Sequence, residues 1–164
     1  MLQSVPFSGI ISGGVPRDGI PPIDDPTFGP VSEESDYMRD EEPVIAIEID
    51  GQAKACPLLI MTRQEIVNDE LSGIPVTVTY CPLCNSSLVF DRWIGGQELD
   101  FGVSGNLRNS DLIMWDRQTE SWCQQLKGEA IVQEYAGTKL EFIPAPVVSW
   151  KTYKESFPDG QVLH

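Results

Sequence analysis

The sequence predicts a mainly β fold of the β-rich α+β class: an antiparallel sandwich or barrel with one or two short helices and an extended N-terminal arm. Segments rich in apolar and β-branched residues recur at close, regular spacing, as strands do. Glycine-containing turns separate them, among them Asp50-Gly51 and Gly95-Gly96. No strand–helix–strand rhythm repeats along the chain, which disfavours a Rossmann or thioredoxin-type sheet. The length of 164 residues suits one domain.

Residues 1–43 differ from the rest of the chain. They hold 7 of the 13 prolines and 5 of the 14 glycines. Nine acidic residues there face two basic ones, so the segment carries half of the net charge. Such a composition buries little apolar surface of its own. We therefore predict that residues 1–43 form an extended acidic arm packed on a single β-rich domain, residues 44–164.

The domain opens with a predicted hairpin. Val44–Ile49 and Gln52–Cys56 flank Asp50-Gly51, a pair that supplies the positive φ angles of a type I′ turn. Beyond this hairpin, the spacing of apolar residues predicts a helix over Leu58–Leu71, and Ser72-Gly73 is a typical helix end.

The remaining segments are predicted to be mostly strands. Pro75–Tyr80, rich in β-branched residues, predicts a strand that leads into Cys81. Three strand pairs follow, each around a short turn: Leu88–Ile94 with Gln97–Val103, Leu112–Asp116 with Ser121–Leu126, and Ala130–Tyr135 with Lys139–Ile143. Ser149–Phe157 predicts a tail helix with Ser149 as its N-cap.

The charge balance excludes some classes of partner. The chain has 25 acidic and 11 basic residues, a formal charge of −14. Phosphate binding needs clustered lysine and arginine, so no nucleic-acid partner is expected. No apolar run approaches the roughly 18–20 residues of a membrane helix, so no transmembrane segment is expected either. A protein or small-molecule partner stays open.

The sharpest chemical feature is the pair Cys81 and Cys84, a CxxC motif at the end of the strand most prone to β structure. Two thiols separated by two residues can turn both sulfurs toward one point, which suits a shared metal ion or an internal disulfide. Pro82 stiffens the loop between them. The plainer alternative is a tight turn with two packed or bridged cysteines. Four cysteines allow three pairings, so Cys56 and Cys123 leave the disulfide connectivity open.

Three functional hypotheses rest on this pair. In the first, Cys81 and Cys84 bind a thiophilic ion, copper or zinc. In the second, the chain is an enzyme of thiol–disulfide exchange, with Cys81 as the attacking and Cys84 as the resolving sulfur. In the third, the loop is a locked turn beneath a partner-binding surface. The single histidine, His164, ends the chain, which disfavours histidine-based zinc sites and serine triads.

A second group of polar residues is a candidate pocket lining. It combines residues of the predicted helix with a polar run downstream: Gln64, Glu65, Asn68, Ser104, Asn106, Arg108, Asp116 and Arg117. In the plainer interpretation, the downstream side chains support turns and the charged helix residues form a solvated face. The Gly105 region lacks the glycine spacing and the lysine of a phosphate-binding loop.

Five motifs spread along the chain resemble one family: Ser12–Pro21, Glu65–Asp69, Val78–Cys84, Phe101–Leu107 and Met114–Thr119. Together they are similar to the domain-of-unknown-function family numbered 3179, over nearly the whole chain. The resemblance implies that Cys81 and Cys84 stand at the centre of the family pattern. It also implies an extracytoplasmic setting, periplasmic or secreted. The first residues do not have the pattern of a signal peptide, which a trimmed export segment would explain.

The sequence departs from the family pattern at Gln64, where the resemblance implies a histidine. That histidine, with Cys81 and Cys84, would suit a soft transition metal. Glutamine is a poor substitute, so the expected site loses its best third ligand. Cys56 and Cys123 stand where an aromatic or another apolar residue is usual. They are therefore packing replacements, a bridge of their own, or replacement ligands.

Overall fold

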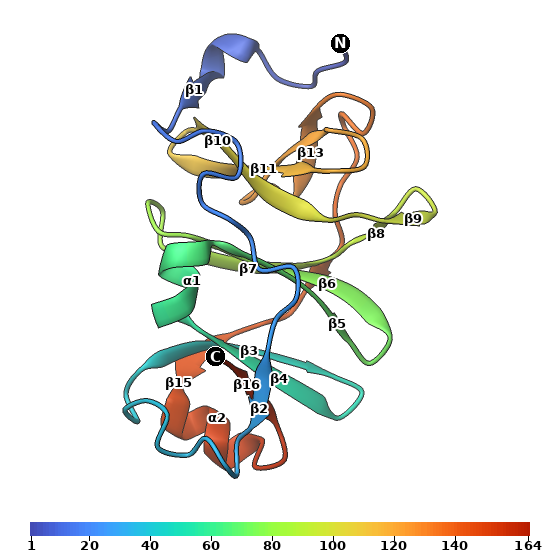
Figure 1. Cartoon of the computed structure of the whole chain (residues 1–164). Coiled ribbons are helices and arrows are strands. Elements are labelled where there is room, and N and C mark those ends of the chain that lie inside the picture. Colours follow the sequence, from blue (N-terminus) through green and yellow to red (C-terminus); the bar gives the residue numbers. More distant parts are fainter.

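The computed structural model describes residues 1–164 and shows three β-sheets stacked in layers (Figure 1). The upper sheet has the order β1 (Ile10–Ser12), β10 (Phe101–Arg108), β11 (Asp111–Asp116), β12 (Trp122–Gln124) and β13 (Glu129–Val132). The middle sheet has the order β14 (Phe142–Ile143), β7 (Ser86–Asp91), β6 (Ile74–Cys81) and β5 (Ile66–Leu71). The lower sheet has the order β15 (Val147–Ser149), β3 (Pro43–Ile49), β4 (Gln52–Pro57), β16 (Gln161–Leu163) and β2 (Phe28–Pro30).

The other elements are short. They are a 3-10 turn (Phe7–Gly9), α1 (Leu58–Gln64), α2 (Trp150–Ser156), and a two-stranded hairpin of β8 (Trp93–Ile94) and β9 (Gln97–Glu98). Strands dominate and all but one of the strand pairings are antiparallel, the exception being β4 with β16. The predicted β-rich α+β class is therefore confirmed, with stacked sheets and no closed barrel. Neither helix has the length and apolar content that a membrane span requires.

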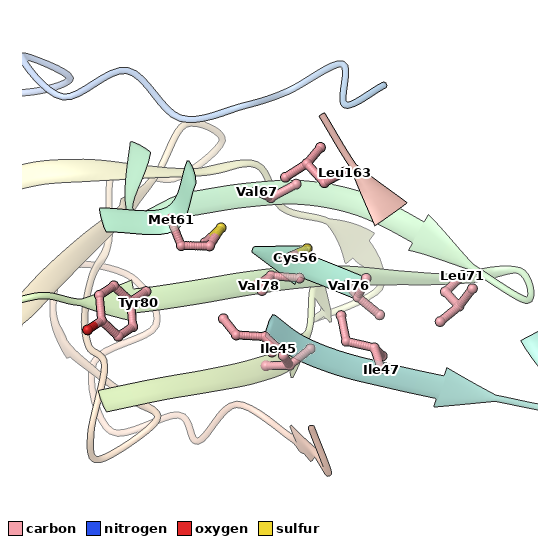
Figure 2. Close-up of a cluster of buried hydrophobic side chains, with 11 residues drawn as sticks. Ile45, Ile47, Cys56, Met61, Val67, Leu71, Val76, Val78, Tyr80 and Leu163 are labelled. Carbon is pink, nitrogen blue, oxygen red and sulfur yellow. The ribbon is translucent and has the colours of Figure 1, made fainter. Parts of the chain in front are cut away.

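The middle sheet is buried on both faces, and β6 shows how its sequence provides for this. Side chains alternate between the two faces of a strand. Val76, Val78 and Tyr80 therefore face the lower sheet, where they pack with Ile45 and Ile47 of β3 in one hydrophobic cluster (Figure 2). Their neighbours in sequence face the upper sheet. A strand buried on both faces is apolar or neutral throughout rather than alternating with charged residues.

Two further clusters complete the layering. Between the middle and upper sheets lie Phe90 of β7, Phe101 of β10 and Met114 of β11, among others. On the outer face of the lower sheet, Trp150 and Tyr153 of α2 cover the small residues of β3 and β4. The tail helix is confirmed, and its first turn is capped as predicted: the Ser149 hydroxyl accepts the Thr152 N–H at 3.1 Å.

The helix predicted over Leu58–Leu71 is wrong in its second half. It ends at Gln64, and Glu65 has a φ of +64°, which no helix contains. Ile66–Leu71 is the edge strand β5, and Ser72-Gly73 is the turn of the β5–β6 hairpin. The apolar residues of β5 serve two cores, because Ile66 faces the upper cluster and Val67 the lower one. Burial on both faces places apolar residues at neighbouring positions of the strand. Over a short segment, this pattern resembles the spacing of apolar residues in a helix.

Two of the predicted hairpins are also wrong in their partners. Gly95-Gly96 joins only the two-residue strands β8 and β9, whereas β7 pairs with β6 and β14, and β10 pairs with β1 and β11. Similarly, β13 pairs with β12, and β14 with β7, although one antiparallel bridge joins Glu129 to Lys139. At both places the chain changes layer, which the strand pattern does not encode. The hairpins β3–β4 and β11–β12 pair as expected.

Residues 1–43 run past all three layers (Figure 1). β1 adds to the upper sheet and β2 to the lower sheet, and Ile23 forms a bridge with Val67 of the middle sheet. Between these contacts, the Asp18 carboxylate accepts hydrogen bonds from the Val103 N–H and the Trp115 indole, both at 3.1 Å. The arm is therefore tied to the domain by backbone and polar contacts as well as by apolar side chains such as Ile20 and Ile23, which pack against the clusters.

The arm approaches the upper sheet closely at Gly105. The pairing of β10 with β11 shifts register between Val103 and Leu107. In this bulge Gly105 has a φ of +81°, and its carbonyl accepts the Gly13 N–H at 2.7 Å. A Cβ at this position would lie 2.2 Å from the Val15 carbonyl oxygen. A residue without a side chain is therefore required here.

We expect Gly105→Ala to lower the free energy of unfolding by about 2–4 kcal/mol, because it combines backbone strain with a backbone clash. Gly51→Ala is the matched control. Gly51 has a similar φ of +79° but open space around it, so only about 1 kcal/mol of strain is expected. Urea unfolding of both variants measures the difference. Equal losses for the two would contradict the close approach of the arm.

Candidate functional site

The CxxC loop joins the two central strands of the middle sheet. β6 ends at Cys81, β7 begins at Ser86, and these two residues are paired, so the chain reverses over four residues. Asn85 completes the reversal with a φ of +46°, and its side chain accepts a hydrogen bond from the Tyr80 hydroxyl at 2.8 Å. The loop is thus fixed at its base, and Cys84 is carried back toward Cys81.

A carboxylate from the upper sheet joins the two sulfurs. Asp111 begins β11 directly after the turn Asn109-Ser110, in which both residues have positive φ. One ligand atom each from Cys81, Cys84 and Asp111 lies within 4.8 Å of the others. The Cys84 Sγ is 3.6 Å from the Asp111 Oδ1. The cluster therefore bridges the middle and upper sheets.

The two sulfurs differ in their exposure. Cys81 is buried, 2% exposed, whereas Cys84 is half-buried, and all four cysteines are free thiols. Burial, together with a smaller effect of the side-chain hydrogen bond with Cys84, raises the pKa of Cys81 to about 12. Without a bound cation, Cys81 is thus a neutral thiol at pH 7. This disfavours Cys81 as an attacking sulfur, and exposure favours Cys84 for that role.

Polar side chains behind the cluster hold its members in place. The Ser86 hydroxyl lies 3.2 Å from the Cys84 Sγ and donates to the Gln125 Oε1 at 2.7 Å. Gln125 in turn donates to Thr79 at 3.0 Å. The second oxygen of Asp111 accepts the Leu126 N–H at 2.9 Å. Burial raises the pKa of Asp111. The hydrogen bonds that its carboxylate accepts, such as those from Leu126 and Cys84, oppose this shift.

The other two cysteines do not join this group. Cys56 is fully buried in the cluster between the middle and lower sheets, on the opposite face from the site. Cys123 of β12 is buried among apolar residues of the upper cluster. Burial raises the pKa of both thiols. Of the roles left open for them, apolar packing is the one that their surroundings favour.

A cavity of about 130 Å³ opens beside the CxxC loop. Leu83, which lies between the two cysteines, forms part of its wall, as does Leu112, the neighbour of Asp111. Of the eight candidate pocket residues, Glu65 and Asn106 line this cavity. Burial raises the pKa of Glu65 to about 7.

Three of the other candidates have structural contacts in the upper sheet. Ser104 donates to the Ile113 carbonyl within the β10 bulge. Arg108 donates to Gln124 at 2.9 Å. Asp116 is fully buried and accepts two N–H hydrogen bonds from its own turn, from Thr119 and Ser121. The contacts of Asp116 support a turn, whereas those of Ser104 and Arg108 join strands of the upper sheet.

Asn68 and Arg117 hold the arm. The Asn68 side chain donates to Asp24 at 2.9 Å and exchanges two hydrogen bonds with the Phe101 backbone. Arg117 forms an ion pair with the same Asp24, also at 2.9 Å. Gln64, the position of the expected histidine, is the last residue of α1 and is half-buried.

Asp111 is the member of the cluster that sequence reasoning missed. It stands at the end of a polar run, Ser104–Asp111, that is typical of a turn, and the turn is indeed there. Its distinguishing property is that it starts a strand of the sheet packed over the CxxC loop. Only the stacking of the two sheets brings them together, and local sequence carries no signal for it.

Comparison with known proteins yields one family. The model of a family described as a protein of unknown function, DUF3179, matches residues 17–164. No curated protein and no solved structure matches the chain. The match covers the arm from Arg17, the CxxC loop and the strand that carries Asp111.

The raised pKa of Glu65 predicts a dependence of stability on pH. Its ordinary value of 4.5 rises to about 7 on folding, so the folded state holds this proton more strongly than the unfolded state. Its contribution to stability is therefore full below about pH 4.5 and is lost as the pH rises through 7. We expect Glu65→Gln to lose less stability between pH 5 and pH 8 than the unchanged protein does.

Urea unfolding midpoints at the two pH values measure this difference. Glu70→Gln, at an exposed position of the same strand, is the control and should retain the full pH dependence. The same slope in Glu65→Gln and in the unchanged protein would show that burial does not hold the Glu65 proton.

Proposed function

The chain belongs to the DUF3179 family, and we propose that its CxxC loop binds a thiophilic metal ion through Cys81, Cys84 and Asp111, with zinc favoured. The observation that carries the proposal is the convergence of two sulfurs and a carboxylate oxygen within 4.8 Å. The three residues come from both sheets that enclose the site. Such a convergence requires the tertiary fold, whereas a plain tight turn would bring only the cysteines together.

The spacing suits a tetrahedral ion. With zinc–sulfur and zinc–oxygen bonds of about 2.3 and 2.1 Å, a tetrahedral site separates a sulfur from a carboxylate oxygen by about 3.6 Å. The Cys84 Sγ and the Asp111 Oδ1 are 3.6 Å apart. Three protein ligands leave one position free, which is the pattern of a zinc site that takes water or substrate rather than a closed structural site.

Metal binding would also give the buried thiol of Cys81 a role, as a ligand that ionises when the ion binds. A neutral Cys81 is a poor nucleophile, and burial stabilises its protonated form. A divalent cation inverts this balance, because a coordinated thiol loses its proton. Binding would thus release protons and weaken as the pH falls. Asp111 would thus supply a third ligand, which the family resemblance leads one to expect from a histidine at position 64.

Copper(I) is the other ion that the sulfurs suit. It prefers soft thiolate ligands and has little use for a carboxylate. Asp111 therefore distinguishes the two ions. Asp111→Asn should weaken zinc binding and leave copper(I) binding nearly unchanged.

Thiol–disulfide exchange is a second candidate, supported by the two free thiols and the partial exposure of Cys84. In this reaction the Cys84 thiolate would attack a partner disulfide, form a mixed disulfide and release one partner thiolate. The Cys81 thiolate would then attack the Cys84 sulfur, which leaves a Cys81–Cys84 bridge and releases the second partner thiol. The raised pKa of Cys81 makes the second step slow. An insulin-reduction assay without turnover would remove this candidate.

We expect the protein, purified without a metal-affinity column, to bind one equivalent of zinc. Cys81→Ser and Cys84→Ser should each weaken zinc binding more than about 100-fold, since loss of a group behind the ligands alone costs 10–100-fold. Elemental analysis and competition with a chromophoric chelator measure stoichiometry and affinity. Cys56→Ala, which removes a thiol on the opposite face of the middle sheet, is the control and should bind zinc normally. Less than a tenth of an equivalent in the unchanged protein refutes the proposal.

Ser86 tests the support behind the ligands. Its hydroxyl lies 3.2 Å from the Cys84 Sγ and links it to Gln125. We expect Ser86→Ala to weaken zinc binding by about 10–100-fold without changing the stoichiometry. Ser87→Ala, at the next position of β7, is the control in the same competition titration. If Ser86→Ala binds zinc as tightly as this control does, the hydroxyl plays no part in the site.

A further inference from the structure

The cavity beside the CxxC loop contains two polar side chains without partners. No hydrogen bond or ion pair within the chain engages the carboxylate of Glu65, and desolvation by burial is the only cause of its raised pKa. The side-chain amide of Asn106 is likewise unpaired, although its backbone N–H donates to Ser104. Both residues line the same cavity. Partly buried polar groups that converge on an apolar cavity without partners are typical of a ligand site.

The backbone of Glu65 is held in an uncommon conformation. Its φ and ψ are +64° and −34°. Its N–H donates to the Met61 carbonyl, and its own carbonyl accepts the Tyr80 N–H, both at 2.8 Å. These contacts tie the residue to α1 on one side and to β6 on the other. Strained non-glycine residues that the surrounding structure fixes in this way concentrate at functional sites.

The rest of the wall is apolar. Its hydrophobic residues are Val15, Ile20, Leu83, Val103, Leu107 and Leu112. A volume of about 130 Å³ is close to the roughly 150 Å³ of a cavity that accepts benzene, so the ligand has about five or six non-hydrogen atoms. The four other surface hollows are larger, about 150 to 390 Å³, and are lined by neither the CxxC loop nor Glu65.

We propose that this cavity binds a small primary amine with a short apolar body, whose ammonium group pairs with the Glu65 carboxylate. The Asn106 side-chain oxygen accepts a second hydrogen bond from the ammonium, and the apolar body packs on the surrounding aliphatic side chains. The net charge of −14 attracts cations and repels anionic ligands of the same size. The ligand would lie against Leu83 and therefore beside both cysteines. This binding site goes beyond the proposed metal ion and does not depend on it.

The test uses n-butylamine as the probe and 1-butanol as its neutral analogue of equal size. Each is titrated into the ¹⁵N-labelled full chain in phosphate buffer with a metal chelator, and amide chemical shifts are followed. We expect butylamine to give saturable shifts centred on Leu83, Gly105 and Leu107. Butanol should bind at least tenfold more weakly, because hydrogen bonds to a charged group are worth about that much.

Variants decide the role of the carboxylate. Glu65→Gln should weaken butylamine binding by about 10–100-fold, while Glu70→Gln should leave it unchanged. If Glu65→Gln does not fold, Leu83→Ala serves instead: Leu83 is 69% exposed, so its truncation spares the core and should still weaken binding. Shifts that do not saturate, equal binding of butanol, or full binding by Glu65→Gln would each overturn the proposal. Because the chelator removes metal, a failure of zinc binding leaves this result intact.

Discussion

The burial of the middle sheet on both faces is the constraint on which the rest of the structure depends. Four short strands separate two hydrophobic clusters, and alternate residues of β6 belong to different clusters. The lower cluster takes Val76, Val78 and Tyr80, and the upper one takes Cys81. No exposed face remains on which this sheet could tolerate a shift of register, since a slip by one residue would exchange the two sets. The position of the CxxC loop is therefore fixed by core packing, although the loop itself lies at the surface.

The same layering explains why the site has three members from two sheets. A loop at the end of a central strand is open to the layer above, and there the first residue of β11 meets it. Cys84 contributes accessibility, Cys81 contributes a buried sulfur, and Asp111 contributes charge. A dithiol alone would serve redox chemistry as well as metal binding. The added carboxylate distinguishes the two proposals, because a bound cation would attract it, whereas a thiolate formed without a cation would be repelled by it.

The strands and the tail helix could be predicted from the sequence because they depend on local composition and capping. Ser149 and Asp50-Gly51 are examples, in which the residue type fixes the local backbone. The prediction from sequence failed where the chain passes from one sheet to another or is buried on both faces. Ile66 and Val67 are both apolar because each faces a different core, and a helix has the same pattern over six residues. The candidate site, too, could be predicted only where it depends on local sequence. The cysteines were visible as a spacing, whereas Asp111 entered only through the contact between sheets.

Residues 1–43, the arm, take part in forming the cavity beside the CxxC loop. Its composition is that of a segment that does not fold alone, yet Gly13, Val15 and Ile20 form part of the cavity wall. The arm reaches that position because Gly105 leaves room for the Val15 carbonyl and because Asp18 receives donors from β10 and β11. The motif around Gly105 is therefore a docking surface for the chain's own first residues, and no phosphate loop is needed to explain its glycine. The arm therefore forms part of the wall of the cavity beside the cysteines. A ligand in the cavity would contact the arm, the CxxC loop and the end of α1 together, three segments that the sequence keeps far apart.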